Sequence, residues 1–344
     1  MLTLDGSTGE GGGQILRTAL ALSCVTGTPF RLTNIRAGRR NPGLQPQHLA
    51  SVLAARDICS ARVLGDELGS REIEFRPGPL LGGTYDWDVA ERKGSAGSVS
   101  LVLQAVFLPL CLADVPSRLR VKGGTHVPWS PPVHYVQEVF LPMIAKLGGE
   151  ARVDLIRWGW YPAGGGEVEV TLRRARGWNP LNLQDRGALR KLRGISAVSN
   201  LPRSIADRQA AELRRLLREA GEDAEISIVE APSPGKGTFV FLVAEFEQVR
   251  AGFGSLGARG KPSEEVAREA FEQWVDFRAG KGALDEHLAD QILPFLALAP
   301  GPSAFTTHRV TNHLLTGAWV VGRFLPREIS VSGKAGEEGE ARVL

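Results

Sequence analysis

Cysteine is scarce in this sequence. The 344 residues include only Cys24, Cys59 and Cys111, an odd number with no CxxC spacing. This usage argues against a disulfide framework and against a zinc site. It is typical of a reducing compartment, so we expect a cytoplasmic protein.

Long apolar segments and a basic amino-terminal leader are also missing. The longest apolar stretch, residues 98–113, is interrupted by Gln104 and Pro109. It falls short of the roughly 20 residues that a membrane span needs. We therefore expect a buried helix in this stretch, no signal peptide in MLTLDGSTGE and no membrane partner.

A large excess of positive charge is absent as well. The 41 Lys and Arg residues face 38 Asp and Glu, which gives a formal net charge of +3. This balance excludes nucleic-acid binding through bulk electrostatics, so any polyanion must be bound at a local site. Only eight of the cations are lysines. An arginine-rich set suits bidentate phosphate recognition, although genomic base composition produces the same bias.

Glycine, in contrast, is abundant. The 41 glycines make up about 12% of the chain, against a usual value of about 7%. The 21 prolines follow no G-X-Y period, which excludes collagen. The chain is also about twice as long as a typical domain of ~150 residues, which predicts two domains or one enlarged by repetition.

Helix and strand patterns repeat along the first half of the chain. The first set is a helix, a strand, a helix and two strands, at residues 14–27, 29–37, 47–59, 61–65 and 71–77. The second set follows the same order, at residues 94–113, 117–123, 131–148, 150–158 and 166–172. The second helices of the two sets begin 84 residues apart and the first helices about 80, which predicts a duplicated αβαββ unit.

A third, shortened copy is predicted at the carboxyl end. It alternates helix and strand, at residues 288–299, 303–310, 312–325 and 327–332.

The segment before this copy, residues 185–280, has its own amphipathic helix at 204–221. Ser204 is the predicted cap of this helix, with Asp207 three residues further on. Strands at 226–231 and 238–246 and a helix from Ser263 follow.

These patterns predict an α/β (α+β) protein. Its predicted parts are a core of repeats one and two in residues 1–184, a smaller inserted α/β domain in 185–280, and a third core repeat in 281–344.

The most distinctive string is GSTGEGGGQ, residues 6–14. It follows a short strand and opens a helix, a context in which backbone N–H groups and the helix dipole bind anions. A Walker A loop is excluded because Gly12 stands where the lysine is needed, and a dinucleotide fingerprint is excluded because Gln14 replaces the third glycine.

Glu10 is a carboxylate in the middle of this anion-binding loop. Its charge would repel a phosphate unless a cation such as Mg²⁺ lay between them, which makes Glu10 a candidate metal ligand. The alternative is a tight turn in which Glu10 only faces the helix dipole.

Several cations and one histidine complete the candidate site. Arg17 lies one helical turn past the loop, and Arg39, Arg40 and Gln47 lie near the start of the second helix. They are candidates for phosphate binding, although surface arginines are usually only solvated. His313 follows the good helix caps Thr311 and Asn312, so we expect it in the first turn of the last helix. There the dipole disfavours imidazolium and leaves a neutral nitrogen free to attack.

Two further segments allow both a structural and a functional interpretation. KGGTHVPWSPP, residues 122–132, ends a strand and enters a helix, with Ser130 as the predicted cap and Pro131 in the first turn. Its prolines and Trp129 could form a wall of a purine slot or only a helix entry. YPAGGGE, residues 161–167, joins two strands and predicts a hairpin, while His308 falls within a predicted strand.

Six ordered motifs together resemble the RNA 3′-terminal phosphate cyclase family: GEGGGQILRTALALS, IRAGRRNPGLQPQHL, GSAGSVSLVLQ, YPAGGGEV, LADQILP and THRVTNHLLTGAWVVGRFLP. The resemblance covers nearly the whole chain. It implies a core of repeated units like those of enolpyruvyl transferases and of the carboxyl-terminal domain of a bacterial translation initiation factor, with a smaller inserted α/β domain.

The resemblance also implies a reaction and its cofactors. An RNA 3′-phosphate becomes a 2′,3′-cyclic phosphate at the expense of ATP, with Mg²⁺ or Mn²⁺, through a covalent histidine–AMP intermediate and an RNA adenylate; AMP and pyrophosphate are released. A phosphate monoester is a poor electrophile until one oxygen carries a leaving group, and covalent catalysis divides this activation into two easier transfers.

Residue by residue, the resemblance implies His313 as the nucleophile and Glu10 as the metal-contacting carboxylate. ATP contacts are implied for Glu10, Arg17, Gln47, Pro131, His287, Asp290 and Gln291, and RNA phosphate contacts for Arg39 and Arg40. His287 stands where the family pattern predicts an aromatic residue opposite Pro131, which puts the base selectivity of the adenine pocket in question.

Two other functions remain as alternatives. One is a cyclase-like protein that binds RNA in ribosome assembly without chemistry, but such relatives lack the histidine nucleophile. The other is an enolpyruvyl-type transferase that shares only the architecture. An oligomer is possible and is not decided by the sequence.

Overall fold

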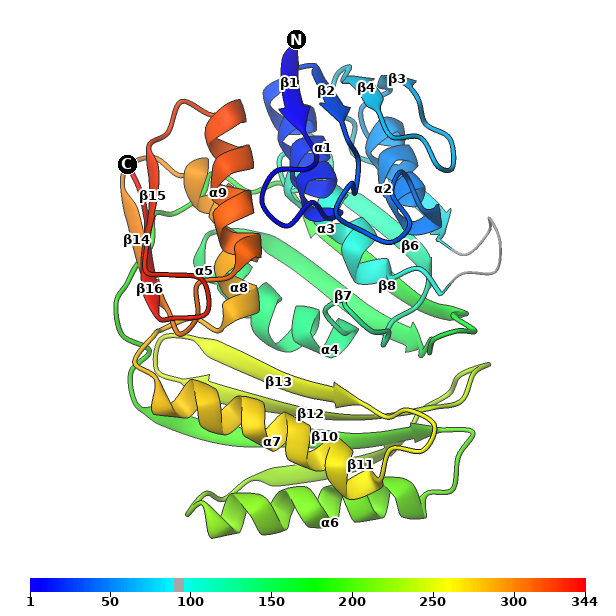
Figure 1. Ribbon diagram of the computed structural model, residues 1–344, viewed down its shortest axis with the longest axis vertical. Coiled ribbons are helices and arrows are strands. Elements are labelled where there is room, and N and C mark those ends of the chain that lie inside the picture. The colour runs from blue at the N-terminus through cyan, green and yellow to red at the C-terminus, as the bar shows by residue number, and fades with distance from the viewer. Residues whose placement is uncertain (90–95) are drawn as a thin grey trace.

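The described part of the chain forms three similar four-stranded sheets and a fourth sheet set apart from them (Figure 1). The computed structural model describes residues 1–89 and 96–344. In each of the three similar sheets an edge strand runs parallel to its neighbour, and the other two strands are antiparallel. The predicted mixed α/β fold with repeated units is therefore confirmed.

The first repeat follows the predicted order of elements, with a leading strand before its first helix. Its elements are β1 (Leu2–Asp5), α1 (Gln14–Thr26), β2 (Phe30–Thr33), α2 (Pro46–Asp57), β3 (Arg62–Leu64) and β4 (Ile73–Arg76). The leading strand makes the complete unit βαβαββ, one strand longer than the αβαββ unit predicted from the sequence.

The second repeat matches the first strand for strand. Its elements are β5 (Thr84–Asp88), α3 (Val99–Leu110), β6 (Ser117–Gly123), α4 (Val133–Tyr135), η1 (Val136–Phe140), α5 (Leu141–Lys146), β7 (Glu150–Arg157) and β8 (Gly166–Arg173). Residues 94 and 95 of the predicted first helix lie outside the described residues. Every residue of α3 except Gln104 is buried, as expected for the long apolar stretch.

One predicted helix start in this repeat was wrong. Ser130 does not cap the helix, and Pro131 is not in its first turn: α4 begins at Val133 with Pro132 in the cap position. The Ser130 hydroxyl instead donates a hydrogen bond of 3.1 Å to the carbonyl oxygen of Val127, so it closes its own loop. The predicted hairpin at 161–167 is confirmed, because β7 and β8 pair antiparallel.

The third repeat is complete rather than shortened. Its elements are β9 (Asn182–Leu183), α8 (Glu286–Ala297), β14 (Ser303–Thr307), α9 (Asn312–Phe324), β15 (Ile329–Ser332) and β16 (Gly339–Val343). The short strand β9 pairs parallel with β14 and completes the sheet. The chain between β9 and α8 thus interrupts the third repeat after its first strand.

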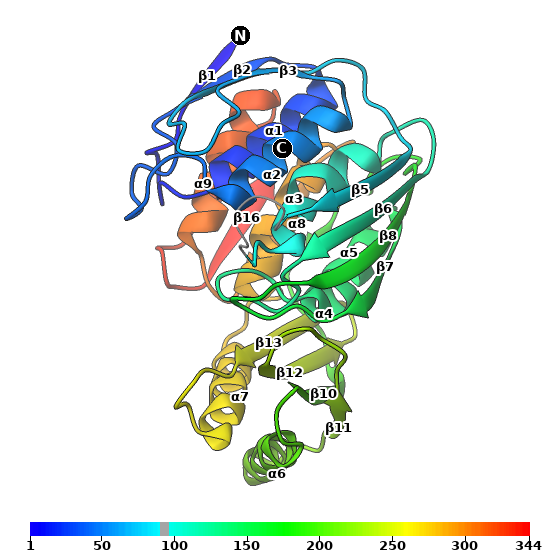
Figure 2. The ribbon, with the colours of Figure 1, turned by 90° about the vertical axis from the view of Figure 1, so that its right-hand side faces the viewer.

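That intervening chain forms the fourth sheet and two helices that pack against each other. Its elements are β10 (Leu189–Ser199), α6 (Ser204–Glu219), β11 (Glu225–Glu230), β12 (Gly237–Phe246), β13 (Arg250–Leu256) and α7 (Ser263–Ala279). Figure 2 shows this unit, hereafter the insert, at one end of the molecule. The boundaries 185 and 280 remain a prediction, which this arrangement supports.

The predicted cap of α6 was also wrong. Arg203, not Ser204, occupies the cap position, and no side chain caps the helix there. The reason is the turn before the helix, in which the backbone N–H of Ile205 donates to the carbonyl oxygen of Pro202 at 3.0 Å. Helical backbone therefore begins before Ser204.

Strand β12 explains how the insert is fixed to the core. Side chains alternate between the two faces of a strand. Val240, Leu242 and Ala244 pack with α6 and α7, in a small hydrophobic core of the insert. Phe239 and Phe241 point the other way and join the large core of the three repeats. Both faces of the sheet are therefore buried.

The helices of the three repeats pack together between their sheets. Contacts join α1 to α2, α3 and α9, and α8 to α3 and α9. This packing brings the starts of α1 and α9, far apart in the sequence, to one place. Within the described residues no helix combines the length and the apolar character that crossing a bilayer requires.

Candidate functional site

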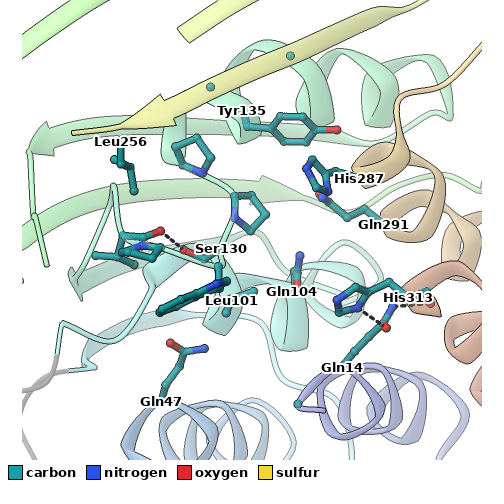
Figure 3. Close-up of a pocket in the computed structure, with 18 of the residues that line it drawn as sticks. Gln14, Gln47, Leu101, Gln104, Ser130, Tyr135, Leu256, His287, Gln291 and His313 are labelled. Carbon is teal, nitrogen blue, oxygen red and sulfur yellow. Dashed lines mark hydrogen bonds between the residues drawn. The ribbon is translucent and has the colours of Figure 1, made fainter. Parts of the chain in front are cut away.

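A cavity of 1020 Å³ lies between the three repeats and the insert. Its walls come from the starts of α1 and α9, from α2, α3 and α8, from residues 127–132, and from β12 and β13 of the insert. Figure 3 shows Gln14, His287 and His313 facing it from different elements.

His313 lies in the first turn of α9, as predicted. Thr311 is in the cap position, and its hydroxyl oxygen accepts a hydrogen bond of 3.0 Å from the backbone N–H of Leu314. Burial lowers the pKa of His313, and the charges of Arg17 and Arg39 act in the same direction, while Asp290 opposes them. The imidazole is therefore neutral near pH 7, with one lone pair available.

Gln14 decides which imidazole nitrogen carries that lone pair. Its amide Nε2 donates to the carbonyl oxygen of His313 at 2.9 Å and to Oδ2 of Asp290 at 3.2 Å, so the amide orientation is fixed. Its Oε1 is then an acceptor and lies 2.5 Å from Nδ1 of His313, so Nδ1 carries the proton. The lone pair of a neutral His313 is on Nε2.

The glycine loop brings Glu10 to that nitrogen. Oε2 of Glu10 lies 2.8 Å from Nε2 of His313, and the other oxygen of the carboxylate pairs with Arg39. Gly9 has a positive φ of 59°, and a Cβ there would lie 2.3 Å from Oγ1 of Thr316. Only glycine lets the loop approach α9 this closely.

A group of cations lies beside the loop. Arg17 is buried in α1, its Nε donates to Oε1 of Gln104 at 3.0 Å, and burial lowers its pKa to about 10. His48 has its pKa lowered to about 3, first by burial and then by Arg17, Arg36 and Arg39. Its Nδ1 is buried without a hydrogen-bond partner. Three guanidinium groups around a neutral imidazole form an electropositive site suited to phosphate.

Helix α8 supplies Asp290, Gln291 and His287 to the opposite side. Burial raises the pKa of Asp290 to about 6, against the lowering effect of His313, His287 and Arg17. Asp285 caps α8 and accepts a hydrogen bond of 2.6 Å from the hydroxyl of Tyr135. The His287 side chain is 60% exposed, and its ring centroid lies 6.0 Å from that of Tyr135.

Gln47 and Pro131 line the same cavity. Gln47 does so from the first turn of α2, where its Oε1 accepts a hydrogen bond of 3.1 Å from the backbone N–H of Ser98. This bond joins the first repeat to the start of α3 in the second repeat. Pro131 stands in the loop before α4.

The structure thus gathers every predicted site residue around the cavity except Arg40, which is exposed and does not line it. His308 is also outside the cavity, just after β14, with Nε2 3.6 Å from Oδ2 of Asp276. The sequence analysis missed Arg36, His48 and Gln104. The signal for Gln104 was present, because it is the one polar interruption near the middle of a long apolar helix.

Comparison with known proteins shows the family of this chain. The family model of RNA 3′-terminal phosphate cyclase matches residues 8–331. The chain is 48% identical over 330 residues to the RNA 3′-terminal phosphate cyclase of Methylococcus capsulatus, covering 94% of this chain and 91% of the relative. It is 44% identical to that of Gloeothece citriformis, over 94% of this chain and 93% of the relative.

An archaeal relative matches along its whole length. The RNA 3′-terminal phosphate cyclase of Pyrococcus furiosus is 42% identical over 344 residues, which cover 100% of this chain and 99% of the relative. With the family model matched over nearly all of its length, the chain belongs to the RNA 3′-terminal phosphate cyclase family.

Proposed function

We propose that this protein converts the 3′-terminal phosphate of an RNA to a 2′,3′-cyclic phosphate with ATP, through a covalent adenylate on His313. One observation carries the assignment of the nucleophile: Gln14 holds the proton on Nδ1, so that Nε2 of His313 is free to attack. The alternative, a relative that binds RNA without chemistry, has no use for such a nitrogen.

The reaction has three transfers. Nε2 of His313 attacks the α-phosphorus of ATP, and the bond to pyrophosphate breaks. An oxygen of the RNA 3′-phosphate then attacks the phosphorus of the adenylate, and the bond to Nε2 breaks. Finally the neighbouring 2′-OH attacks the activated terminal phosphorus, loses its proton, and AMP leaves. The Nδ1 proton stays hydrogen-bonded to Gln14, and this hydrogen bond stabilises the positive charge that develops on the imidazole ring.

Glu10 controls the nucleophile before ATP arrives. Oε2 of Glu10 lies 2.8 Å from Nε2 of His313 and so occupies the place that the α-phosphorus of ATP must take. His313 can attack only when Glu10 turns away from Nε2 toward another cation.

Mg²⁺ or Mn²⁺ is the cation that suits this position. Among the described residues no three His, Cys, Asp or Glu side chains gather to hold a metal ion. Magnesium is commonly bound by one or two carboxylates together with substrate phosphates, and Glu10 fits that role. The ion would neutralise charge on the phosphates of ATP.

The remaining groups divide between ATP and RNA. Arg17 and Arg36, beside the neutral imidazole of His48, form the cationic site for the phosphates of ATP. Pro131 and His287 hold the adenine, and the exposed His287 ring can stack on it as an aromatic residue would. Arg39 and Arg40 bind RNA phosphates; Arg40, outside the cavity, can reach only a phosphate upstream of the RNA end.

Incubation with ATP labelled at the α-phosphate tests the nucleophile. We expect Mg²⁺-dependent, acid-labile labelling of the wild-type protein, an added mass of one AMP, and no labelling of His313→Ala. The matched control is His308→Ala, which changes a histidine outside the cavity and keeps full labelling. An unlabelled wild-type protein that still binds RNA would support the alternative.

A further inference from the structure

Trp129 is the most exposed large hydrophobic side chain in the part of the chain that the structure describes. Its exposed fraction is 96%, whereas the next in order, Leu64 and Tyr161, reach 66% and 65%. Leaving an indole in water forfeits the burial that normally stabilises a tryptophan. Packing within this protein therefore gives no reason for a tryptophan at this position.

The backbone holds this side chain outward. Trp129 has a φ of 58°, a left-handed conformation that is rare for a bulky residue. The loop is closed on one side by the hydrogen bond from Ser130 to Val127, and on the other the backbone N–H of Val133 donates to the carbonyl oxygen of Thr125 at 3.0 Å. Strained backbone at a site is characteristic of groups fixed for ligand binding.

Trp129 stands two residues before Pro131, one wall of the proposed adenine pocket, but its chain neighbour Ser130 lies on the other side of the cavity from His287, the second wall (Figure 3). Trp129 lines the cavity beside Ser130. In Figure 3, Ser130, Gln47 and Leu256 lie on one side of the cavity, and His313, His287 and Gln291 lie on the other. The cavity thus offers flat rings at two places, and the reaction brings two nucleotides into it, one from ATP and one from RNA.

We propose that Trp129 is a stacking platform for a nucleobase in the 3′-terminal dinucleotide of the RNA substrate. The inference rests on the proposed function. Proteins bind single-stranded RNA by stacking unpaired bases on aromatic side chains, and such stacking tolerates any base sequence. The net charge of this protein is only +3, so bulk electrostatic attraction to RNA is weak. A stacking contact would add to the binding that the phosphate contacts provide.

The test separates the two half-reactions. Trp129→Ala keeps the rate and the ATP dependence of adenylation without RNA, which also shows that the variant folds. With a 3′-phosphorylated oligoribonucleotide, its kcat/KM for cyclisation falls by about 5- to 150-fold, the range expected from loss of one stacked base. Trp129→Phe keeps most of the wild-type value. Leu64→Ala, the matched loss of an exposed hydrophobic side chain outside the cavity, changes neither reaction.

Abasic RNA identifies the base. We expect that removing one of the last two bases lowers wild-type kcat/KM by a similar factor and abolishes the difference between wild type and Trp129→Ala. The inference is overturned if that difference persists with both abasic RNAs. It is also overturned if Trp129→Ala raises the KM for ATP in adenylation, because Trp129 then stacks on adenine. Wild-type protein that cyclises no RNA refutes the proposed function itself.

Discussion

Replacing Gln14 with alanine removes the group that selects the reactive nitrogen of His313. Oε1 of Gln14 accepts a hydrogen bond of 2.5 Å from Nδ1 of His313, and Nε2 of Gln14 donates one of 2.9 Å to the His313 carbonyl oxygen. Without it, the imidazole can carry its proton on Nε2, where the lone pair is needed. Adenylation should therefore slow although His313 is still present.

The size of the loss follows from the charge that develops on the ring. As Nε2 bonds to phosphorus the imidazole becomes cationic, so the bond from Nδ1 to Gln14 becomes a hydrogen bond from a charged donor. Such bonds contribute about 1.5–3 kcal/mol, which corresponds to a rate lower by roughly 10- to 150-fold. Gln14→Glu keeps an acceptor but adds a negative charge, which raises the pKa of His313 and moves the pH profile upward.

Single-turnover formation of the enzyme–AMP adduct measures this effect, at a series of pH values from 5 to about 9. Because burial lowers the pKa of His313, the wild-type rate should fall only below the ordinary histidine range. We expect Gln14→Ala to be slow at every pH and Gln14→Glu to recover at high pH. A Gln14→Ala protein within twofold of wild type throughout would refute the assignment of the tautomer.

Three further predictions concern stability. Burial in the folded state raises the pKa of Asp290 to about 6 from an ordinary 3.8, so the folded protein loses stability as the pH rises through this range and the carboxyl ionises. Urea unfolding should therefore show that Asp290→Asn is stabilised over wild type more at pH 8 than at pH 4. Gly9→Ala should destabilise by about 1–3 kcal/mol, because its Cβ meets Oγ1 of Thr316, and Thr316→Ala should recover part of the loss in thermal melts. Phe241→Ala should cost about 3–5 kcal/mol and expose the insert to limited proteolysis.

The repeats and the position of His313 could be predicted from the sequence because their signals are local. A helix cap such as Thr311 marks the start of a helix within a few residues, and it places His313 in the first turn. Hydrophobic periodicity likewise predicts the helices of both repeats. These features need no knowledge of the tertiary structure.

The missed features depend on contacts between distant segments. His48 becomes part of the site because α1 and the loop before α2 bring Arg17, Arg36 and Arg39 around it. The two residues of β9 are too few to show a strand pattern, so the third repeat looked shortened. The apolar run of β12 predicts a strand, but both of its faces are buried, so the run does not show which side chains face the site.

The place of the insertion explains why the insert contributes to the site at all. The chain leaves the third repeat after β9 and returns at α8, the helix that carries His287, Asp290 and Gln291. The insert therefore rejoins the core within a few residues of the proposed nucleotide contacts. Phe239 and Phe241 anchor β12 to the core, and the neighbouring strand β13 lines the cavity. An insertion after the matching strand of another repeat, β1 or β5, would rejoin the core at the start of α1 or α3, beside the glycine loop or Val99, and not at α8.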